Sequence, residues 1–594
     1  MQLHRLKLRF RRVFRLRKRQ VEGISLQAER QLELNFIRRL GRLVAVRRFV
    51  GIWLLIIIVF GGTVIVQTRA LSGYYQTLQP VPGGMYSEGI VGEYTNANPL
   101  YATGQADEAV SHLIFPGLFK YNDQNQLVGD LADSWSVNAT GEVYTIHLRP
   151  GLTWQDGQPL TANDVVFTYQ SIQNPDTQSP LYDSWQSVTV TASDAQTVVF
   201  TLPNPLSSFP YSLTTGIIPQ HILGSVPADQ LRSASFNTTQ PVGSGPFAMQ
   251  AIQVTGDTPQ TREEEVELKP FAHYYGGKPK LDNFVVNTFG TQEAMVQSFK
   301  EDQLNAMVGL TSLPTSLKNV SDVTQYSMPL SAENMVFFKT SQGVLSDTKV
   351  RQALVAGSNT SQIINQLGYK TTPVNEPLLT GQLGYNPAYT QSSYNPAQAA
   401  QLLTKDGWLV GSGGFRYKDG QQLTFGLYAQ DDSEDAMVAH ALQKQWRQIG
   451  VNVPVYLEGT TNMQQTIATH SYDALLYGIS IGPDPDVFVY WDSSQNDLRS
   501  ARLNFSEYSS TTADASLEAG RTRSDPQLRA IKYEPFLRAW QRDAPALGLY
   551  QPRFLYVTRG KVFGLTEHTL NVDTDRYDNV QNWMIRQTPE NIVK

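Results

Sequence analysis

The fold can be read most clearly from residues 112–172, HLIFPGLFKYNDQNQLVGDLADSWSVNATGEVYTIHLRPGLTWQDGQPLTANDVVFTYQSI. Tyr144, Ile146 and Leu148 alternate with polar residues, which predicts a half-buried strand. Gly157 supplies the positive φ that a tight turn needs after Trp154. Residues 161–164, TAND, predict the capped start of a helix. Short strands, tight turns and capped helices in succession indicate an α/β domain.

This stretch resembles the family 5 extracellular solute-binding proteins, which are the receptors of dipeptide, oligopeptide and nickel ABC importers. The likeness covers about residues 85–565, because other motifs of that family follow in the expected order. These motifs are VGSGPF at 242–247, YYGGKPKL at 274–281, VRQAL at 350–354, YNPAQAAQLL at 394–403 with GW at 407–408, IGV at 449–451 and YDA at 472–474. Several long motifs in one order are specific, whereas any one alone would be weak.

The resemblance implies an α/β, two-lobed fold of the periplasmic-binding-protein type (class II, dipeptide/oligopeptide-binding), with a third domain inserted in the first lobe. The chain crossings near Pro329 and Leu547 would form the hinge. The expected parts are a basic arm at 1–48, a transmembrane helix at 49–67, a linker at 68–84, lobe I at 85–105, 238–327 and 548–594, the inserted domain at 106–237, and lobe II at 328–547.

The resemblance also implies a ligand-binding cleft between the lobes, in which a peptide is held like an added strand. The expected ligand-binding residues are Thr103, Gly104, Gln105, Tyr182, Trp185, Gly478, Ile479, Ser480, Ile481 and Asp484. Tyr182 and Trp185 are equally compatible with ordinary core packing.

The chain departs from the family pattern at Ile481, where peptide receptors often carry an Asp that pairs with the ligand's α-ammonium. A buried cation without a partner is costly. Either Asp484 or Asp486 takes over this role, or the ligand is not a peptide with a free amine. Asp484 precedes a proline, so it is also compatible with a simple loop cap.

Residues 49–66, FVGIWLLIIIVFGGTVIV, carry no charge and predict a transmembrane helix. A helix of that length is about 27 Å long, close to the roughly 30 Å hydrocarbon core of a bilayer. A core helix would keep a polar stripe, and a signal peptide would have a shorter apolar run with a cleavage site.

Charge predicts the orientation of this helix. Residues 1–48 hold fifteen Lys and Arg against three Glu, a net charge of +12. The whole chain has a net charge of −5, so the residues after 48 carry −17. Basic residues beside a span stay in the cytoplasm, which places the larger part outside the cell. The basic arm, with an amphipathic helix expected at 24–46, is interpreted as lying on anionic lipid; nucleic-acid binding is the alternative.

Composition and motifs argue against several chemistries. The chain has no cysteine, which excludes disulfides, thiolate metal sites and the lipid-modified cysteine that anchors many exported bacterial proteins. Residues 243–248, GSGPFA, partly resemble a dinucleotide fingerprint, but Pro246 favours a turn between strands. No nucleophile elbow, P-loop or histidine pair at metal-ligand spacing occurs. We therefore expect no catalytic residues, no metal and no cofactor.

The leading hypothesis is a monomeric, membrane-anchored bacterial receptor, not an enzyme, that captures extracellular peptides and delivers them to ABC permease subunits, without binding nucleic acid. It would be a single-pass protein of the cell membrane with a cytoplasmic N-terminus. One alternative is a sensory or adhesion receptor of the same fold that binds a non-peptide ligand. Another is an ectoenzyme such as a peptidase.

Overall fold

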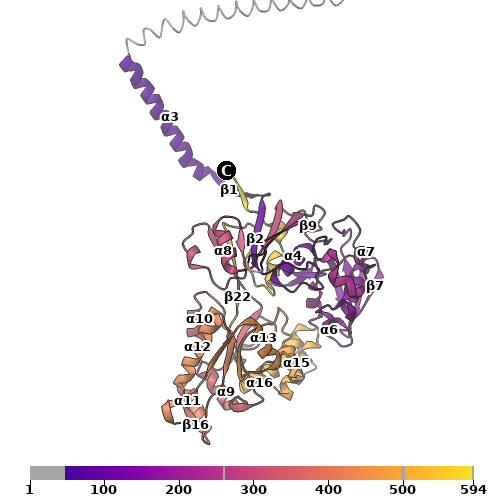
Figure 1. The fold of residues 1–594 in the computed structure, drawn as a ribbon, viewed down its shortest axis with the longest axis vertical. Helices are drawn as coiled ribbons and strands as arrows, with labels where there is room; N and C mark the ends of the chain where they lie inside the picture. The colour runs from indigo at the N-terminus through magenta and orange to yellow at the C-terminus, as the bar shows by residue number, and fades with distance from the viewer. Residues whose placement is uncertain (1–46, 259–260, 497–501, 592–594) are drawn as a thin grey trace, which may run out of the picture. The chain divides into compact units, whose positions relative to one another are not determined.

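The computed structural model describes residues 47–258, 261–496 and 502–591 and divides the chain into two compact units (Figure 1). The first unit comprises residues 1–79 and 587–594, and the second residues 80–586. Strands β1 (Gln76–Val81) and β23 (Arg586–Asn591) form a two-stranded sheet. The basic arm and the amphipathic helix expected at 24–46 lie outside the described residues, apart from the first two residues of helix α3.

Helix α3 (Arg47–Tyr75) contains the apolar run, and its large side chains, such as Ile58 and Phe60, are exposed. None of the helices in the described part of the chain is long and apolar enough to cross a bilayer. Within the expected linker at 68–84, α3 continues to Tyr75 and the extended strand β1 follows it. Gln, Arg, Ala and Leu between 67 and 72 favour helix, and the first proline after them is Pro80.

A seven-stranded sheet forms lobe I, in the order β13-β22-β12-β2-β11-β10-β9. Its strands are β2 (Met85–Val91), β9 (Phe247–Thr255), β10 (Glu263–Pro270), β11 (Asn283–Phe289), β12 (Ala306–Met307), β13 (Val323–Pro329) and β22 (Arg553–Arg559). Helix α8 (Gln292–Lys300) packs on it, and β2 pairs in parallel with β11 and β12.

Helix α4 (Gln105–Ile114) packs on β2, β9 and β11 of this sheet, although 106 was expected to begin the inserted domain. The turn at 243–247 fixes its end. The Gly245 N–H donates to Ile114 O at 2.8 Å, and a Cβ at Gly243 would lie 2.0 Å from that oxygen. The glycines therefore allow close backbone approach. The segment bends at 244–246 and leads into strand β9, as expected, but a short 3-10 helix (Ser235–Asn237) precedes it, so it does not join two strands.

The inserted segment contains two small sheets. Their strands are β3 (Phe119–Tyr121) with β4 (Leu127–Gly129), and β5 (Ala132–Val137), β6 (Val143–Leu148), β8 (Thr197–Thr201) and β7 (Thr189–Asp194) in that order. Strand β6 confirms the predicted alternation. Helix α5 (Ala162–Gln173) begins with the predicted cap, since Asp164 Oδ2 accepts from the Thr161 N–H at 2.8 Å. The shorter helices are α6 (Tyr182–Trp185) and α7 (Gln220–Leu223).

A five-stranded sheet forms lobe II, in the order β19-β18-β20-β14-β21. Its strands are β14 (Ala332–Phe338), β18 (Leu427–Gln430), β19 (Val455–Glu458), β20 (Ala474–Ser480) and β21 (Ala546–Tyr550), and its helices are α9 (Thr348–Ala356), α10 (Thr360–Gln366), α11 (Pro396–Lys405), α12 (Ser433–Gln448), α13 (Thr460–Thr469), α14 (Phe488–Trp491), α15 (Thr511–Arg521) and α16 (Pro526–Asp543). Strands β15 (Leu409–Val410), β16 (Arg416–Lys418) and β17 (Gln421–Gln422) form a small separate sheet. Figure 1 shows α9, α11, α12 and α16 grouped away from β2, β9 and α4.

The chain passes between the two large sheets at two adjacent crossings. One lies between β13 and β14, around Leu330. The other lies between β21 and β22, at Gln551 and Pro552, a few residues beyond the expected Leu547, which is inside β21. The Leu330 N–H donates to Pro552 O at 2.9 Å, and Gln551 Nε2 donates to Leu330 O at 2.7 Å. The crossings are therefore hydrogen-bonded to each other.

Candidate functional site: the cavity between the lobes

A cavity of about 540 Å³ lies where the two large sheets meet. Lobe I contributes Gln105 and Glu108 of α4 and residues 571–573. Lobe II contributes the ends of β14 and β20 and the first turn of α12. The hinge residues Leu330 and Pro552 complete the wall. A cavity of this size that is shared by two hinged lobes can enclose a small ligand when the lobes close.

Two of the predicted ligand-binding residues line this cavity. Gln105 lines it from lobe I and Ser480 lines it from lobe II. Thr103 and Gly104, which precede Gln105, are exposed but do not line it. Gly478 lies opposite Asn334 across β14 and β20, and a Cβ at this glycine would approach Asn334 Oδ1 to 2.6 Å. The glycine therefore leaves room for a cavity-lining amide. Ile479 faces the core instead.

The predicted aromatic residues do not line the interlobe cavity. Trp185 is 3% exposed, and its ring packs 4.2 Å from that of Tyr169, centroid to centroid, in the core of the inserted segment. It borders a separate cavity of about 300 Å³, which Arg521 of lobe II also lines. Tyr182, on the same short helix, is half-buried. For Trp185, core packing is the better interpretation.

The loop after β20 is held by contacts within the protein. The Ile481 N–H donates to Ser331 O at 3.0 Å, and its side chain packs in the apolar core. Both oxygens of Asp484 accept from Arg529, at 2.8 and 2.7 Å. The predicted role of Asp484 in pairing with a ligand ammonium is therefore not favoured, because its carboxylate is already paired.

Asp486 is also paired within the protein. Its Oδ2 accepts from Ser208 Oγ at 2.8 Å and lies 3.2 Å from Arg521 Nη2. Ser208 belongs to the inserted segment, whereas Asp486 and Arg521 belong to lobe II. This contact therefore connects the inserted segment to lobe II through one carboxylate oxygen, while Asp486 Oδ1 is buried and accepts no hydrogen bond within the described protein.

The sequence analysis missed a group of acids at the start of α12. Asp432 caps the helix by accepting from the backbone N–H groups of Glu434 and Asp435, both at 2.9 Å. Glu434 Oε1 accepts from the hydroxyls of Tyr369 and Tyr550, at 3.0 and 2.8 Å. Burial, and next the charges of Asp432 and Glu434, raise the pKa of Asp435 to about 7.

Acids line the lobe I wall as well. Burial raises the pKa of Glu108 to about 7, with a further contribution from Asp573 and then Asp107. Glu108 and Asp573 both line the cavity. The run DDSED at 431–435 could have drawn attention in the sequence, but its convergence with Glu108 depends on packing between segments that are far apart.

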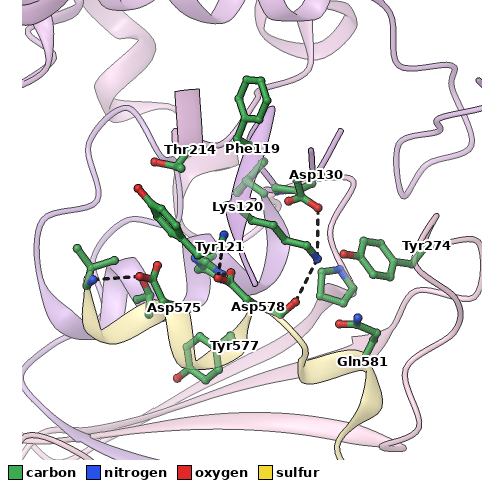
Figure 2. Close-up of a pocket in the computed structure, with 17 residues that line it drawn as sticks. Phe119, Lys120, Tyr121, Asp130, Thr214, Tyr274, Asp575, Tyr577, Asp578 and Gln581 are labelled. Carbon is green, nitrogen blue, oxygen red and sulfur yellow. Dashed lines mark hydrogen bonds and ion pairs between the residues drawn. The ribbon is translucent and has the colours of Figure 1, made fainter. Parts of the chain in front are cut away.

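A second cavity, of about 140 Å³, is lined by His112 of α4, by residues of the inserted segment and by residues between 572 and 581 (Figure 2). Lys120 Nζ lies 3.5 Å from Asp130 Oδ1 and donates to Asp578 O at 3.1 Å. His112 Nε2 lies 3.0 Å from Asp578 Oδ1, and although burial disfavours its charge, Asp578 raises its pKa. These charges compensate one another, so this cluster joins the inserted segment to lobe I.

A match to a known protein family shows which family the chain belongs to. Residues 126–499, which are more than half of the chain, match the family described as bacterial extracellular solute-binding proteins, family 5 Middle. The chain belongs to this family. Among the described residues no group of three or more metal-ligating side chains gathers, and the family is one of solute-binding proteins.

Individual known proteins are similar to most of the chain. The oligopeptide-binding protein AppA of Bacillus subtilis is 26% identical over 85% of this chain and 92% of its own. The structure of NikZ from Campylobacter jejuni, in complex with Ni(L-His), has a TM-score of 0.70 at 26% identity and covers 84% of this chain and 99% of its own. CtaP of Listeria monocytogenes, an ABC transporter substrate-binding protein, has a TM-score of 0.73 at 24% identity, with 85% and 99% coverage.

Proposed function

We propose that this family 5 protein is a receptor that captures peptides in the interlobe cavity and delivers them to an ABC importer, without chemical change to the peptide. The observation that supports this most strongly is the cavity itself, which residues of both lobes line beside two adjacent crossings. Closure around a bound ligand links binding to the conformation that a permease would recognise. The curated relative AppA of Bacillus subtilis is named for oligopeptide binding.

The position of Gln105 and Ser480 on opposite walls supports a ligand that spans the cleft. An extended peptide offers backbone donors and acceptors to both walls and leaves its side chains in the remaining space. A cavity of about 540 Å³ has room for a short peptide and for water.

Thermal unfolding of the full chain in detergent tests this function. Ligands that bind only the folded state raise the melting temperature, and a ligand at about one hundred times its dissociation constant contributes about 2.7 kcal/mol. We expect a shift of several degrees with a tryptic digest of casein. The control is the same digest after complete hydrolysis to amino acids. No shift with any peptide mixture would contradict the peptide function.

We also propose that the protein is held at the cell membrane by residues 49–66, with the second unit outside. The support comes from the sequence: this run has no charge, and the residues before it carry a net charge of +12. An anchor in the membrane would keep the receptor close to its permease without a lipid-modified cysteine. Co-purification of permease subunits with the full chain would test the partnership.

A further inference from the structure

The cavity of about 300 Å³ that Trp185 borders lies between the inserted segment and lobe II. Helix α6, the residues that follow it and residues 202–206 form most of its wall, and the end of α15 contributes Arg521 and Thr522 (Figure 1). We call this cavity the α15 pocket. No described residue lines both the α15 pocket and the interlobe cavity, so the proposed peptide site does not account for it.

The buried part of the α15 pocket is apolar. The rings of Trp185 and Phe209 meet there edge to face, with centroids 5.7 Å apart, and Leu202 is buried beside them in the same wall. The exposed part of the wall is polar and contains Ser184, Ser187, Asn204 and Ser212. Because apolar surface is poorly hydrated, a ligand with an apolar body gains free energy when it fills the buried part.

Arg521 is the one charged side chain among the described residues of the pocket wall. Its guanidinium lies over the ring of Phe488, 4.1 Å from the centroid, and its Nη2 is 3.2 Å from Asp486 Oδ2. The side chain is 25% exposed, and none of its N–H groups donates a hydrogen bond within the described protein. A guanidinium has five N–H donors in a plane that matches a carboxylate, so Arg521 brings unused donors to an apolar pocket.

The pocket wall combines residues from the two sides of the hinge. The Ser207 N–H and Ser207 Oγ both donate to Arg521 O at 2.9 Å, and Ser208 Oγ donates to Asp486 at 2.8 Å. These serines belong to the inserted segment, which the charged cluster around Lys120 joins to lobe I. The pocket is therefore complete only when the inserted segment contacts lobe II, and a ligand that fills it stabilises that contact.

We propose that the α15 pocket is an effector site, which binds a small molecule with an apolar body and a carboxylate and thereby strengthens peptide binding. The carboxylate accepts hydrogen bonds from Arg521, and the apolar body packs on Trp185 and Phe209. A neutral analogue lacks the charge-assisted hydrogen bond, and a cationic analogue is repelled by the guanidinium. The site itself goes beyond the proposed function, whereas the coupling to peptide binding rests on it.

Indole-3-acetate, indole-3-acetamide and tryptamine test the ligand class, since they share one ring system and differ in the charge of the side chain. Calorimetry with the full chain in detergent, corrected for titration into detergent alone, gives the three affinities. We expect the acid to bind at least about tenfold more tightly than the amide, because charge-assisted hydrogen bonds are the stronger ones. Arg521→Gln should remove this preference. Arg523→Gln is the matched control, since Arg523 is exposed and outside the pocket wall.

A second variant tests the location of the site. Ser212→Phe places a large side chain in the exposed part of the wall and should weaken the binding of both the acid and the amide. If neither compound binds, or if Ser212→Phe leaves both affinities unchanged, the α15 pocket is not the site. If the acid and the amide bind equally, or if Arg521→Gln keeps the preference for the acid, the carboxylate class is wrong.

The coupling is measured with the casein digest. In the presence of saturating indole-3-acetate, the digest should reach half of its additional melting-temperature shift at a several-fold lower concentration, because coupling between two sites is reciprocal. Arg521→Gln should abolish this change. An unchanged concentration would overturn the effector role. If indole-3-acetate binds with the expected preference and the digest does not bind at all, the α15 pocket stands and the peptide function is contradicted.

Discussion

The guanidinium of Arg529 donates to both carboxylate oxygens of Asp484, at 2.8 and 2.7 Å, and both side chains are buried. The pair connects helix α16 to the loop that follows β20. A buried pair of this geometry holds the loop in one conformation, because the loss of either partner leaves an uncompensated charge. The loop that the family resemblance assigned to the ligand therefore has a structural function first.

Arg529→Met is expected to lower the free energy of unfolding by about 3–5 kcal/mol, since Asp484 would remain buried without its partner. Urea unfolding of the full chain in detergent, followed by tryptophan fluorescence, measures this. Arg538→Met on the same helix is the control, because Arg538 is exposed and pairs only with Glu534 and Tyr389. Equal stability of the Arg529 variant and the wild type would contradict the role of the pair.

The contact between Ser208 and Asp486 should stabilise the closed arrangement of the cleft. Ser208→Ala removes a hydrogen bond to a carboxylate, which contributes about 1.5–3 kcal/mol, so peptide affinity should fall about tenfold or more. Calorimetry with a bound peptide provides the affinity. Ser233→Ala is the control, since Ser233 hydrogen-bonds only within its own turn. An unchanged affinity would show that closure does not depend on this contact.

Two buried glutamates of lobe II should make stability depend on pH. Glu333 and Glu376 are 0% exposed, and neither oxygen of Glu333 accepts a hydrogen bond in the described protein. Burial, and then Glu376, raise the pKa of Glu333 well above its usual range, and burial raises that of Glu376 to about 7. The folded state therefore holds protons that the unfolded state has released, so stability falls as pH rises from about 4.5 to 7 and beyond.

Glu333→Gln should raise stability at pH 8 and reduce this loss, because the folded state no longer has to keep a buried carboxyl protonated. Urea unfolding at a series of pH values from 5 to 8 measures the slope. Glu518→Gln changes an exposed residue of the same lobe and should leave the slope unchanged. A variant that is less stable than the wild type at pH 8 would mean that Glu333 has an unseen favourable partner.

Membrane attachment should depend on the apolar side chains of α3. Leu55→Arg with Ile58→Arg places two charges in the run, at about 2.5–3.5 kcal/mol each near a bilayer centre, and should shift the protein into the soluble fraction after alkaline carbonate extraction. Leu409→Arg with Val410→Arg is the control, because these lobe II side chains are similarly exposed. Retention of the α3 variant in the membrane would exclude this run as the anchor.

Local features of the fold were predictable from sequence because they depend on neighbouring residues. Two of them are the cap of Thr161 with Asp164 and the alternation in β6, which depend on residues close together in sequence. A third is the turn at 243–247, where the backbone approaches so closely that only glycine fits. Helices α9 and α10 are separate, and Asn359 caps the second of them. Gly357 and Ser358 lower helix propensity at that point.

The site was predictable only in part. Gln105 and Ser480 could be assigned because they lie in segments with recognisable motifs. The pairing of Asp484 with Arg529 was not visible, because the two residues are far apart in sequence and the pair forms only when α16 folds against the loop. Trp185 was ambiguous for a similar reason, since a large aromatic residue suits a core as well as a cleft.

The hydrogen-bonded crossings at Leu330 and Gln551 have a practical consequence. Two chain crossings that bend together define a single hinge axis. Points on the two lobes that are far from this axis are therefore displaced most when the lobes move relative to each other. The chain contains no cysteine, so one thiol introduced on each lobe would carry a dye pair without any background labelling. The receptor is thus suited to conversion into an optical reporter for its own cargo.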